Sequence, residues 1–294
     1  MEYQKQKHDL GFFQASPLPT EEELAHFYSE QYFQSTASNH GVYKKDYSQE
    51  EIAFFKNQAL VAEFIWKRFT LKDSGRLLDV GCGEGFFLDF FQKRGWHIEG
   101  CDFASDGLEH HNRDLLKYFV QGDIFTITKD KAWRNERYDF LNLGNVLEHV
   151  TDPIQLLLNL KNLLHEKSLL RIVIPNDFTK FQELLLEKGM LSKETWFNPP
   201  VHLNYFSVES LKNVFQKTGL RVVDILVDFP IELYLVNLHS NYWADRTKGS
   251  DAHKARMLID TFLVNQGLEN YVHYMSAAAA CSFGRNIIAY VSLG

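Results

Sequence analysis

The chain has 294 residues, of which 45% are hydrophobic, and a formal net charge of −7 at pH 7. This length suffices to bury a full core, so we expect one elaborated domain or a domain with a helical annex. The negative charge and the lack of a long basic run argue against nucleic acid as a partner. The three cysteines are too few and too scattered for a disulfide framework or a metal knuckle, and we expect them to be small buried hydrophobes. They are Cys82, Cys101 and Cys281.

The chain shows no targeting or membrane signal in its sequence. Its first ten residues, MEYQKQKHDL, lack the apolar core of a signal peptide. No run approaches the roughly 18 apolar residues that a membrane span needs. We therefore expect a cytoplasmic protein without membrane contact, and the pattern predicts no particular oligomeric state.

Residues 50–69 form the first predicted helix. Apolar side chains recur there at steps of three and four, the spacing of one buried helical face. This helix should precede the sheet and pack on it. The recurring residues are Phe55, Ala59, Ala62, Trp66 and Phe69.

Strand and helix patterns then alternate along the chain, which implies a parallel sheet. The predicted strands are RLLDV, WHIEGC, KYFV, YDFLNL, LLRIVIP, LRVVDILV and NIIAYVSL. The predicted helices run from Glu84 to Gly95, from Ser105 to Asn112, from the N-cap Asp152 to Glu166, and from the N-cap Ser207 to Gly219.

Residues Leu77–Gly85, LLDVGCGEG, join a strand to a helix through three glycines at alternate positions. Gly81, Gly83 and Gly85 permit positive φ and let a ligand approach the backbone where a Cβ would collide. A dinucleotide site reads GxGxxG and points a helix N-terminus at a pyrophosphate. Here the spacing is GxGxG, and the carboxylate of Asp79 would repel a pyrophosphate. S-adenosylmethionine (SAM) carries a sulfonium, an ammonium and no phosphate, so the stretch favours SAM over NAD.

This strand, turn and helix resemble motif I of the class I SAM-dependent methyltransferases. The resemblance implies a Rossmann-like fold, an α/β doubly wound sheet of seven mostly parallel strands with the last one antiparallel. It also implies SAM as cofactor, S-adenosylhomocysteine as its product, and a small-molecule substrate. We expect an N-terminal lid segment at 1–50, a core at 51–228 with an insertion at 175–206, a helical annex at 229–285, and the last strand at 286–294.

The two later additions to the core are expected to roof the active site. Segments 175–206 and 229–285 both follow the carboxyl ends of strands, where ligands bind in open α/β sheets. The annex resembles that of methyltransferases from surface-polysaccharide and secondary-metabolite pathways. The N-terminal stretch resembles one that follows a zinc ribbon in some of those enzymes, but the ribbon's cysteines are absent here, so no metal is predicted.

The resemblance also implies a set of cofactor-binding residues. Asp102 follows the glycine turn by about 20 residues, where a carboxylate accepts the ribose hydroxyls, although it could instead cap a helix. Asp123 lies where the family places an acid against the adenine amine, with Ile124 beside the ring. The complete predicted set is Asp79, Gly81, Cys82, Gly83, Gly85, Phe86, Asp102, Phe103, Asp123, Ile124, Leu143, Gly144 and Asn145.

Methyl transfer from a sulfonium is an in-line displacement, so the enzyme supplies alignment and a desolvated path. A hydroxyl acceptor also needs a base, and His suits that role near neutral pH. His202 is the first candidate and His149 the second, and either could instead bond the backbone in a structural role. The substrate-binding candidates are Asn176, which is equally a turn residue, and Tyr205 and Tyr242, whose alternative place is the core.

The sequence therefore predicts a SAM-dependent methyltransferase that acts on a small molecule. The expected acceptor is a sugar, a nucleotide-sugar or a natural-product hydroxyl, and O-methylation is favoured over C- or N-methylation. One alternative is a SAM-binding sensor or scaffold without turnover, since function belongs to sites rather than to folds. The other is an NAD-dependent oxidoreductase, which the GxGxG spacing and Asp79 disfavour.

Overall fold

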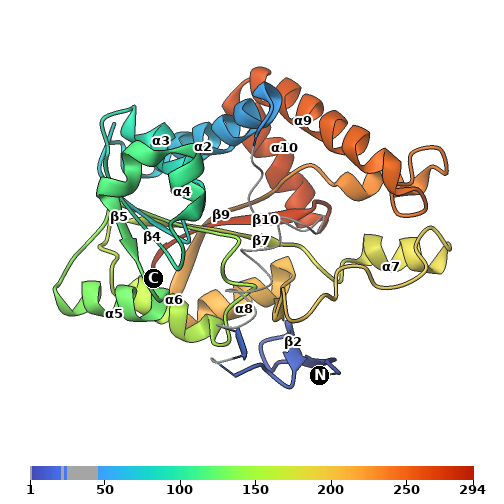
Figure 1. Ribbon diagram of the computed structural model, residues 1–294, viewed down its shortest axis with the longest axis horizontal. Coiled ribbons are helices and arrows are strands. Elements are labelled where there is room, and N and C mark those ends of the chain that lie inside the picture. The colour runs from blue at the N-terminus through green and yellow to red at the C-terminus, as the bar shows by residue number, and fades with distance from the viewer. Residues whose placement is uncertain (1, 21–22, 25–45) are drawn as a thin grey trace.

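The computed structural model describes residues 2–20, 23–24 and 46–294, and the remainder of the predicted lid segment lies outside the described residues. A seven-stranded sheet runs through the centre of the molecule (Figure 1). Its strands are β3 (Arg76–Val80), β4 (His97–Asp102), β5 (Phe119–Gln121), β6 (Phe140–Gly144), β7 (Leu169–Pro175), β9 (Leu220–Val227) and β10 (Asn286–Leu293).

The strand order across this sheet is β5-β4-β3-β6-β7-β10-β9. Strand β10 is antiparallel to both of its neighbours, and the pairs among β3, β4, β5, β6 and β7 are parallel. The predicted fold class, with an antiparallel last strand, is therefore confirmed. Because the parallel strands end at one edge, the loops that follow them are brought together there.

Helices cover both faces of the sheet, as Figure 1 shows, and give three layers. One face carries α2 (Gln49–Thr70), α3 (Phe86–Gln92), α4 (Asp106–His111) and α10 (Leu268–Ala280). The other face carries α5 (Ile124–Trp133), α6 (Pro153–Lys161) and α8 (Val208–Thr218). Each face has its own cluster of buried apolar side chains.

Helix α2 buries the predicted face only in part. Ala59, Ala62 and Trp66 have no exposed surface, whereas Phe55 and Phe69 are half-buried. The predicted helix after Asp152 is also shorter, because α6 ends at Lys161 and the turn that follows buries Leu163 and Leu164. The sequence pattern does not predict α5, nor the short 3-10 helix at Arg113–Tyr118.

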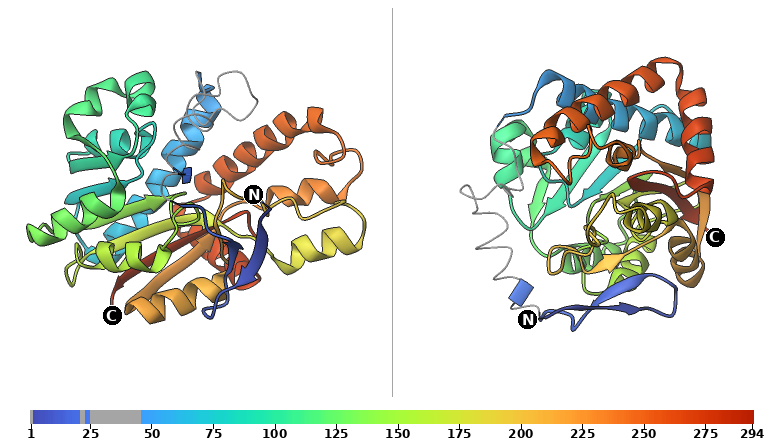
Figure 2. Two further views of the ribbon diagram at one scale, coloured as in Figure 1. Left: turned by 60° about the horizontal axis from the view of Figure 1, so that its bottom comes forward. Right: turned by 90° about the vertical axis from the view of Figure 1, so that its right-hand side faces the viewer.

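A second, three-stranded sheet lies below the main one and was not predicted. It pairs β1 (Gln4–Lys7) with β2 (Phe13–Ser16), and β2 with β8 (Asn204–Tyr205). Figure 2 shows the β1–β2 hairpin against the lower face, where Phe12 packs on Phe206 with ring centroids 4.8 Å apart. Strand β1, with the sequence QKQK, is exposed throughout, so it lacks the apolar alternation that marks a strand.

The annex is mostly helical, whereas the insertion contains a single α-helix in largely irregular backbone. The insertion contains α7 (Lys180–Glu187). The annex contains 3-10 turns at Ile231–Val236 and Arg246–Lys248, then α9 (Gly249–Asn265) and α10. Asn57 of α2 donates a hydrogen bond to Thr261 of α9 over 3.1 Å, and Ser276 of α10 donates one to Asp224 of β9 over 2.8 Å. The annex is thus fastened to both the first helix and the edge of the sheet.

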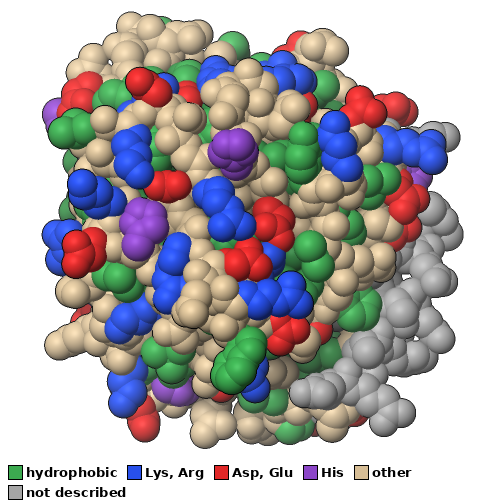
Figure 3. Space-filling model, turned by 90° about the vertical axis from the view of Figure 1, so that its left-hand side faces the viewer, with side chains coloured by type: hydrophobic (Ala, Val, Ile, Leu, Met, Phe, Trp, Pro, Cys, Tyr) green, Lys and Arg blue, Asp and Glu red, His purple; other side chains and the backbone are tan. Residues whose placement is uncertain are grey.

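None of the described helices is both long enough and apolar enough to cross a bilayer. On the face shown in Figure 3, Lys and Arg side chains are interspersed with Asp and Glu.

Trp66 joins helix α2 to the sheet and offers a test of this packing. Its indole N–H donates to the Asp139 carbonyl over 3.2 Å, and its ring centroid lies 4.3 Å from that of Trp96. We expect Trp66→Ala to lower the free energy of unfolding by about 3–5 kcal/mol, because it leaves a large cavity in the core. Urea denaturation measures this loss. The control Trp133→Ala removes an indole that is 89% exposed and should change stability by less than about 0.5 kcal/mol. Equal losses in the two variants would contradict the packing described.

Candidate active site

A cleft of about 1270 Å³ opens at the edge where the parallel strands end. Residues after β3, β4, β5, β6 and β9, and the first residue of β10, line it. Helix α2 contributes Phe54, Phe55 and Gln58, and helix α9 contributes Arg256. This volume exceeds that of most small-ligand sites, so the cleft has room for two small molecules at once.

The glycine turn forms one wall of this cleft. Gly81 and Gly85 have φ of +75° and +76°. A Cβ on Gly81 would lie 2.3 Å from a methyl group of Val146, and one on Gly85 would lie 2.4 Å from a methyl group of Leu108. The backbone N–H groups of Gly81 and Cys82 both donate to the Cys101 carbonyl, over 2.8 and 3.1 Å. The turn is therefore closely packed and tied to the neighbouring strand.

Asp102 holds the same turn from the end of β4. Its carboxylate accepts hydrogen bonds from the backbone N–H of Gly83 over 2.9 Å and of Ala104 over 3.3 Å. Burial raises the pKa of Asp102, and these backbone N–H groups oppose the increase. The carboxylate also lines the cleft. Asp102 thus shapes the loop while it remains at the surface that a ligand would touch.

Asp123 lies further along the same wall, after β5. It is the N-cap of α5, where its side chain accepts from Thr126 N over 2.7 Å, and it also lines the cleft. Leu143 is fully buried and does not line the cleft, because its side chain points into the apolar core. The other predicted cofactor residues in the cleft wall are Asp79, Gly81, Cys82, Gly83, Gly85, Phe86, Phe103, Ile124, Gly144 and Asn145.

A row of polar side chains crosses the sheet beneath this wall. Asp79 pairs in register with Asn142 on β6, and Asn142 with Arg171 on β7, so the three side chains share one face. The Asn142 amide donates to Asp79 Oδ1 over 2.6 Å, and Arg171 Nη1 donates to Asn142 Oδ1 over 2.7 Å. All three residues line the cleft although each is more than nine-tenths buried.

Burial controls the charge of Asp79. Desolvation raises its pKa to about 7, against the hydrogen bond from Asn142 and the positive charge of Arg171, and Asp102 adds a further increase. The carboxylate is therefore divided between its two protonation states at neutral pH. An ammonium or sulfonium placed beside it would favour the ionised form.

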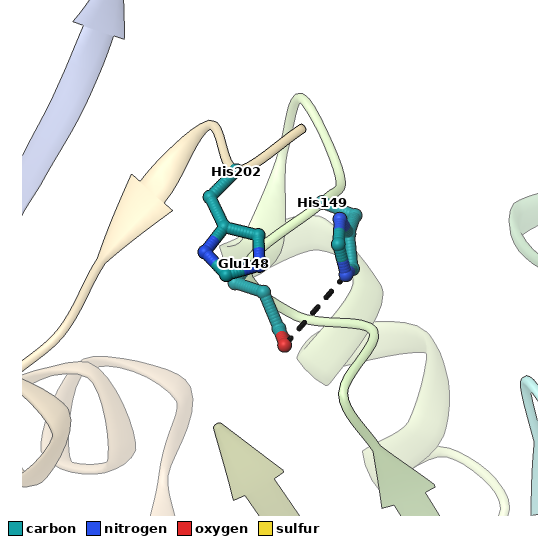
Figure 4. A group of neighbouring side chains, drawn as sticks. All are labelled: Glu148, His149 and His202. Atoms are coloured by element: carbon teal, nitrogen blue, oxygen red, sulfur yellow. Dashed lines mark ion pairs between the residues drawn. The ribbon is translucent and has the colours of Figure 1, made fainter. Parts of the chain in front are cut away.

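Two histidines and a glutamate converge below the cleft, as Figure 4 shows. His149 and Glu148 follow β6, and His202 precedes β8. His149 Nε2 lies 3.7 Å from Glu148 Oε1, and the two imidazole centroids are 4.9 Å apart. The Glu148 carbonyl accepts hydrogen bonds from the backbone N–H of Leu203 and Asn204, over 2.8 and 3.0 Å, which brings the two segments together. One ligand atom from each of the three side chains lies within 4.8 Å of the others, so the group could also hold a metal ion.

The two histidines differ in access and in basicity. His149 lines the cleft, and its Nδ1 lies 2.5 Å from the Val201 carbonyl, so Nδ1 carries the proton and Nε2 does not in the neutral ring. Burial lowers the pKa of both rings, and that of His202 falls to about 3. His202 does not line the cleft. Glu148 beside them is fully buried, and burial raises its pKa to about 8.

The three predicted substrate-binding residues lie outside the cleft wall. Asn176 is buried and donates to the Gly284 carbonyl over 3.0 Å. The Tyr205 hydroxyl donates to the His202 carbonyl over 2.7 Å. Tyr242 lines a separate pocket of about 170 Å³ together with Trp196. Backbone hydrogen bonds hold the first two in the packing of the insertion, so their placement does not support a role in binding substrate.

The cleft includes several residues that the sequence analysis missed. Asn142 and Arg171 lie inside the predicted strands YDFLNL and LLRIVIP, and a polar residue in each apolar run was the available signal. Asp228 and Asn286 line the far end of the cleft, where the Asn286 side chain donates to Asp228 Oδ2 over 2.6 Å. Of the two expected roof segments, the annex provides Arg256, whereas no described residue of 176–206 lines the cleft.

The raised pKa of Asp79 predicts a pH-dependent cost to the fold. Its folded pKa of about 7 exceeds the ordinary 3.8, so the stability it contributes is present below about pH 4 and is lost as pH rises to about 7. This loss is worth up to about 4 kcal/mol. We expect Asp79→Asn to be more stable than the native chain at pH 8, and this advantage to shrink at pH 5, as measured by urea denaturation. The control Asp73→Asn changes an exposed residue and should follow the native chain at both pH values. If the free energies of unfolding of the native chain and Asp79→Asn differ by the same amount at pH 5 and pH 8, the raised pKa of Asp79 is contradicted.

Comparison with known proteins identifies the family of the chain. The sequence model of a family described as "Methyltransferase domain" matches residues 51–225. The ubiquinone biosynthesis O-methyltransferase of Hydrogenovibrio crunogenus is 32% identical over 115 residues, which are 38% of this chain and 47% of that protein. The protein of the same name from Glaesserella parasuis is 28% identical over 153 residues, which are 47% of this chain and 65% of that protein. The matches thus span about half to two thirds of these curated relatives.

Solved structures share the fold at low sequence identity. A SAM-dependent methyltransferase from Archaeoglobus fulgidus matches with a TM-score of 0.50 and 18% identity, over 83% of this chain and 94% of that one. The plantazolicin methyltransferase BpumL, solved in complex with SAH, matches with a TM-score of 0.52 and 16% identity, over 91% of this chain and 93% of that one. Since the family match covers more than half of the chain and the strand order agrees with it, the chain belongs to the methyltransferase-domain family and has its SAM-dependent class I fold.

Proposed function

We propose that this protein transfers the methyl group of SAM to a hydroxyl of a small molecule bound beside it in the 1270 Å³ cleft. The observation that carries the proposal is a single cavity that joins the glycine turn, the carboxylates of Asp79 and Asp102, and the imidazole of His149. The residues fit the cofactor, because the glycine turn presents backbone to the cleft and the carboxylates of Asp79 and Asp102 lie beside it. SAM supplies the methyl group and a neutral thioether as leaving group.

The cleft residues divide naturally between cofactor and acceptor. Asp102 would accept the ribose hydroxyls, and Asp123 with Ile124 would border the adenine. The backbone at Gly81 and Gly144 would face the methionine end. The remainder of the cleft, from His149 after β6 to the end of β9 and the start of β10, is then left for the acceptor. That part is lined by Phe54, Asp228, Arg256, Asn286 and Ile288.

The curated relatives bear on the class of acceptor. The curated relatives named above are O-methyltransferases of ubiquinone biosynthesis, which favours oxygen over carbon or nitrogen as the methylated atom. A sugar, a nucleotide-sugar or a natural-product hydroxyl remains the acceptor proposed from the sequence. Membership of the methyltransferase-domain family removes the support for an NAD-dependent oxidoreductase.

His149 is the proposed general base for a hydroxyl acceptor. It faces the cleft, and the hydrogen bond from Nδ1 to the Val201 carbonyl leaves Nε2 as the nitrogen that can take a proton. His202, the first candidate from the sequence, is now assigned to packing behind His149, where its low pKa keeps the ring neutral.

The ribose assignment predicts a defined loss of cofactor affinity. Asp102→Asn removes the charge while it keeps the size of the side chain. Hydrogen bonds to a charged acceptor are worth roughly 1.5–3 kcal/mol, so the Kd of S-adenosylhomocysteine should rise about tenfold to a hundredfold. Isothermal titration calorimetry measures this change. Asp114→Asn, at an exposed position outside the cleft, is the matched control and should bind like the native chain. An unchanged Kd in Asp102→Asn would remove Asp102 from the cofactor site.

The base assignment is tested by His149→Gln. We expect the rate of labelled methyl transfer to a hydroxyl acceptor to fall about 10²- to 10⁴-fold, with S-adenosylhomocysteine affinity retained. Because burial lowers the pKa of His149 below 6.5, this group should limit the native rate only in acid and not above about pH 7.

His202→Gln and EDTA are the discriminating treatments for that site. Under the base assignment, His202→Gln should cost less than His149→Gln, and EDTA should leave the rate unchanged. Loss of activity with EDTA, restored by a divalent cation, would instead assign the three side chains of Figure 4 to a metal ion. Binding of SAM without turnover of any acceptor would favour the sensor alternative.

A further inference from the structure

Arg171 is an unusual residue for its position. It lies in the middle of β7, a strand whose seven residues are all buried, and its own side chain is 6% exposed. A guanidinium cannot lose its charge, so its burial is costly unless every N–H finds an acceptor. Nη1 donates to Asn142, and the side chain also hydrogen-bonds to Tyr290, but Nε is buried with no partner among the described residues. The guanidinium therefore has one N–H without an acceptor, and the residue that carries it lines the cleft.

Asp79 is the complementary group at the other end of the polar row. It lies two strands from Arg171 and on the same face of the sheet. Among the described residues, only Asn142 donates a side-chain hydrogen bond to its carboxylate, and that bond uses Oδ1. A buried cation and a buried anion thus face one cleft, and the amide of Asn142 holds both in place.

We propose that Asp79 and Arg171 bind the two charges of one α-amino-acid group, the ammonium at Asp79 and the carboxylate at Arg171, and that this group is the methionine end of SAM. The inference rests on the proposed cofactor site and assigns to Arg171, which lies outside the glycine motif, the role of carboxylate anchor. Bidentate pairing with a carboxylate is the interaction for which a guanidinium is best shaped.

The spacing of the row suits such a group. The Asn142 amide bonds Asp79 Oδ1 over 2.6 Å and Arg171 Nη1 over 2.7 Å, so these two atoms are separated by at most roughly 7–8 Å across the amide. An amino-acid ammonium and carboxylate lie roughly 3 Å apart, and a charge-assisted hydrogen bond adds about 2.8 Å at each end, for a span of up to roughly 9 Å. One zwitterion can therefore bridge the two side chains across Asn142.

Arg256 is the other arginine among the described cleft residues, and its position favours the acceptor. It lies near Asp228, 4.0 Å from Nη1 to Oδ2, at the ends of β9 and β10. Strand β10 is three strands from β3, and β9 is four, so the strands beside this arginine are roughly 14–19 Å along the sheet from the Asp79 backbone. That distance exceeds the span of one amino-acid group.

The test compares two ligands that differ only at the group in question. 5′-Methylthioadenosine has the nucleoside and thioether of S-adenosylhomocysteine but no amino-acid end. We expect the native chain to bind S-adenosylhomocysteine at least tenfold more tightly in calorimetric titration. Arg171→Met should raise the Kd of S-adenosylhomocysteine about tenfold to a hundredfold. It should change the Kd of 5′-methylthioadenosine less than threefold. Arg171→Lys, which keeps a charge, should restore part of the preference.

The variants are chosen so that each outcome is informative. Methionine suits an apolar strand, and replacing a buried ion by an apolar side chain is often tolerated, so Arg171→Met should fold. Arg137→Gln, at an exposed position outside the cleft, is the matched control and should keep the native preference. A native chain that binds neither ligand would refute the cofactor site itself, which separates that failure from failure of the inference.

Four results would overturn the inference while the cofactor site stands. One is equal affinity of the native chain for the two ligands. Another is an equal loss of affinity for both ligands in Arg171→Met, which would show that Arg171 has a structural role. The third is loss of the preference in Arg256→Gln but not in Arg171→Met, which would move the carboxylate to the other arginine. An amino-acid acceptor would have the same chemistry, and it is distinguished by an unchanged S-adenosylhomocysteine affinity in Arg171→Met, which counts against our assignment.

Discussion

The attachment of the glycine turn to strand β4 is the constraint on which the rest of the site depends. A loop with three glycines has a large conformational entropy, and it would not hold a ligand unless something fixed its shape. The Cys101 carbonyl accepts from Gly81 and Cys82, and the Asp102 carboxylate accepts from Gly83. The last two residues of β4 therefore immobilise the turn. The Asp102 carboxylate also faces the cleft.

Buried charge is the cost of this arrangement. Asp79 and Arg171 are desolvated in a sheet that would be more stable with apolar side chains at these positions. The row is held by two short hydrogen bonds through Asn142, which keep both ions in one geometry before any ligand arrives. Such preorganisation lowers the entropy that a ligand loses on binding, because the charges need no rearrangement. The buried charges therefore lower the stability of the sheet, and in return the site is formed before a ligand binds.

The core of the fold could be predicted because its signals are local. The alternation of strands and helices and the spacing around Gly81 are each read within a few residues, and they predicted the sheet and one wall of the cleft. The β1–β2 hairpin could not be read in that way, since its exposed polar strand is stabilised by pairing with β8 and by Phe12 on Phe206. Arg171 carried a signal that was not used: a charge within an apolar run marks a position where function opposes stability.

The acceptor side of the cleft was predicted less well for a physical reason. Its wall comes from α2, α9 and the ends of β9 and β10, segments far apart in sequence whose meeting depends on tertiary packing. His202 and His149 illustrate the difficulty, because both follow the expected pattern and lie 4.9 Å apart, yet only His149 lines the cleft. The Val201 carbonyl fixes the ring of His149, and the loop that carries Val201 also holds His202 behind it. The residue that the sequence favoured as base therefore packs behind the histidine that lines the cleft.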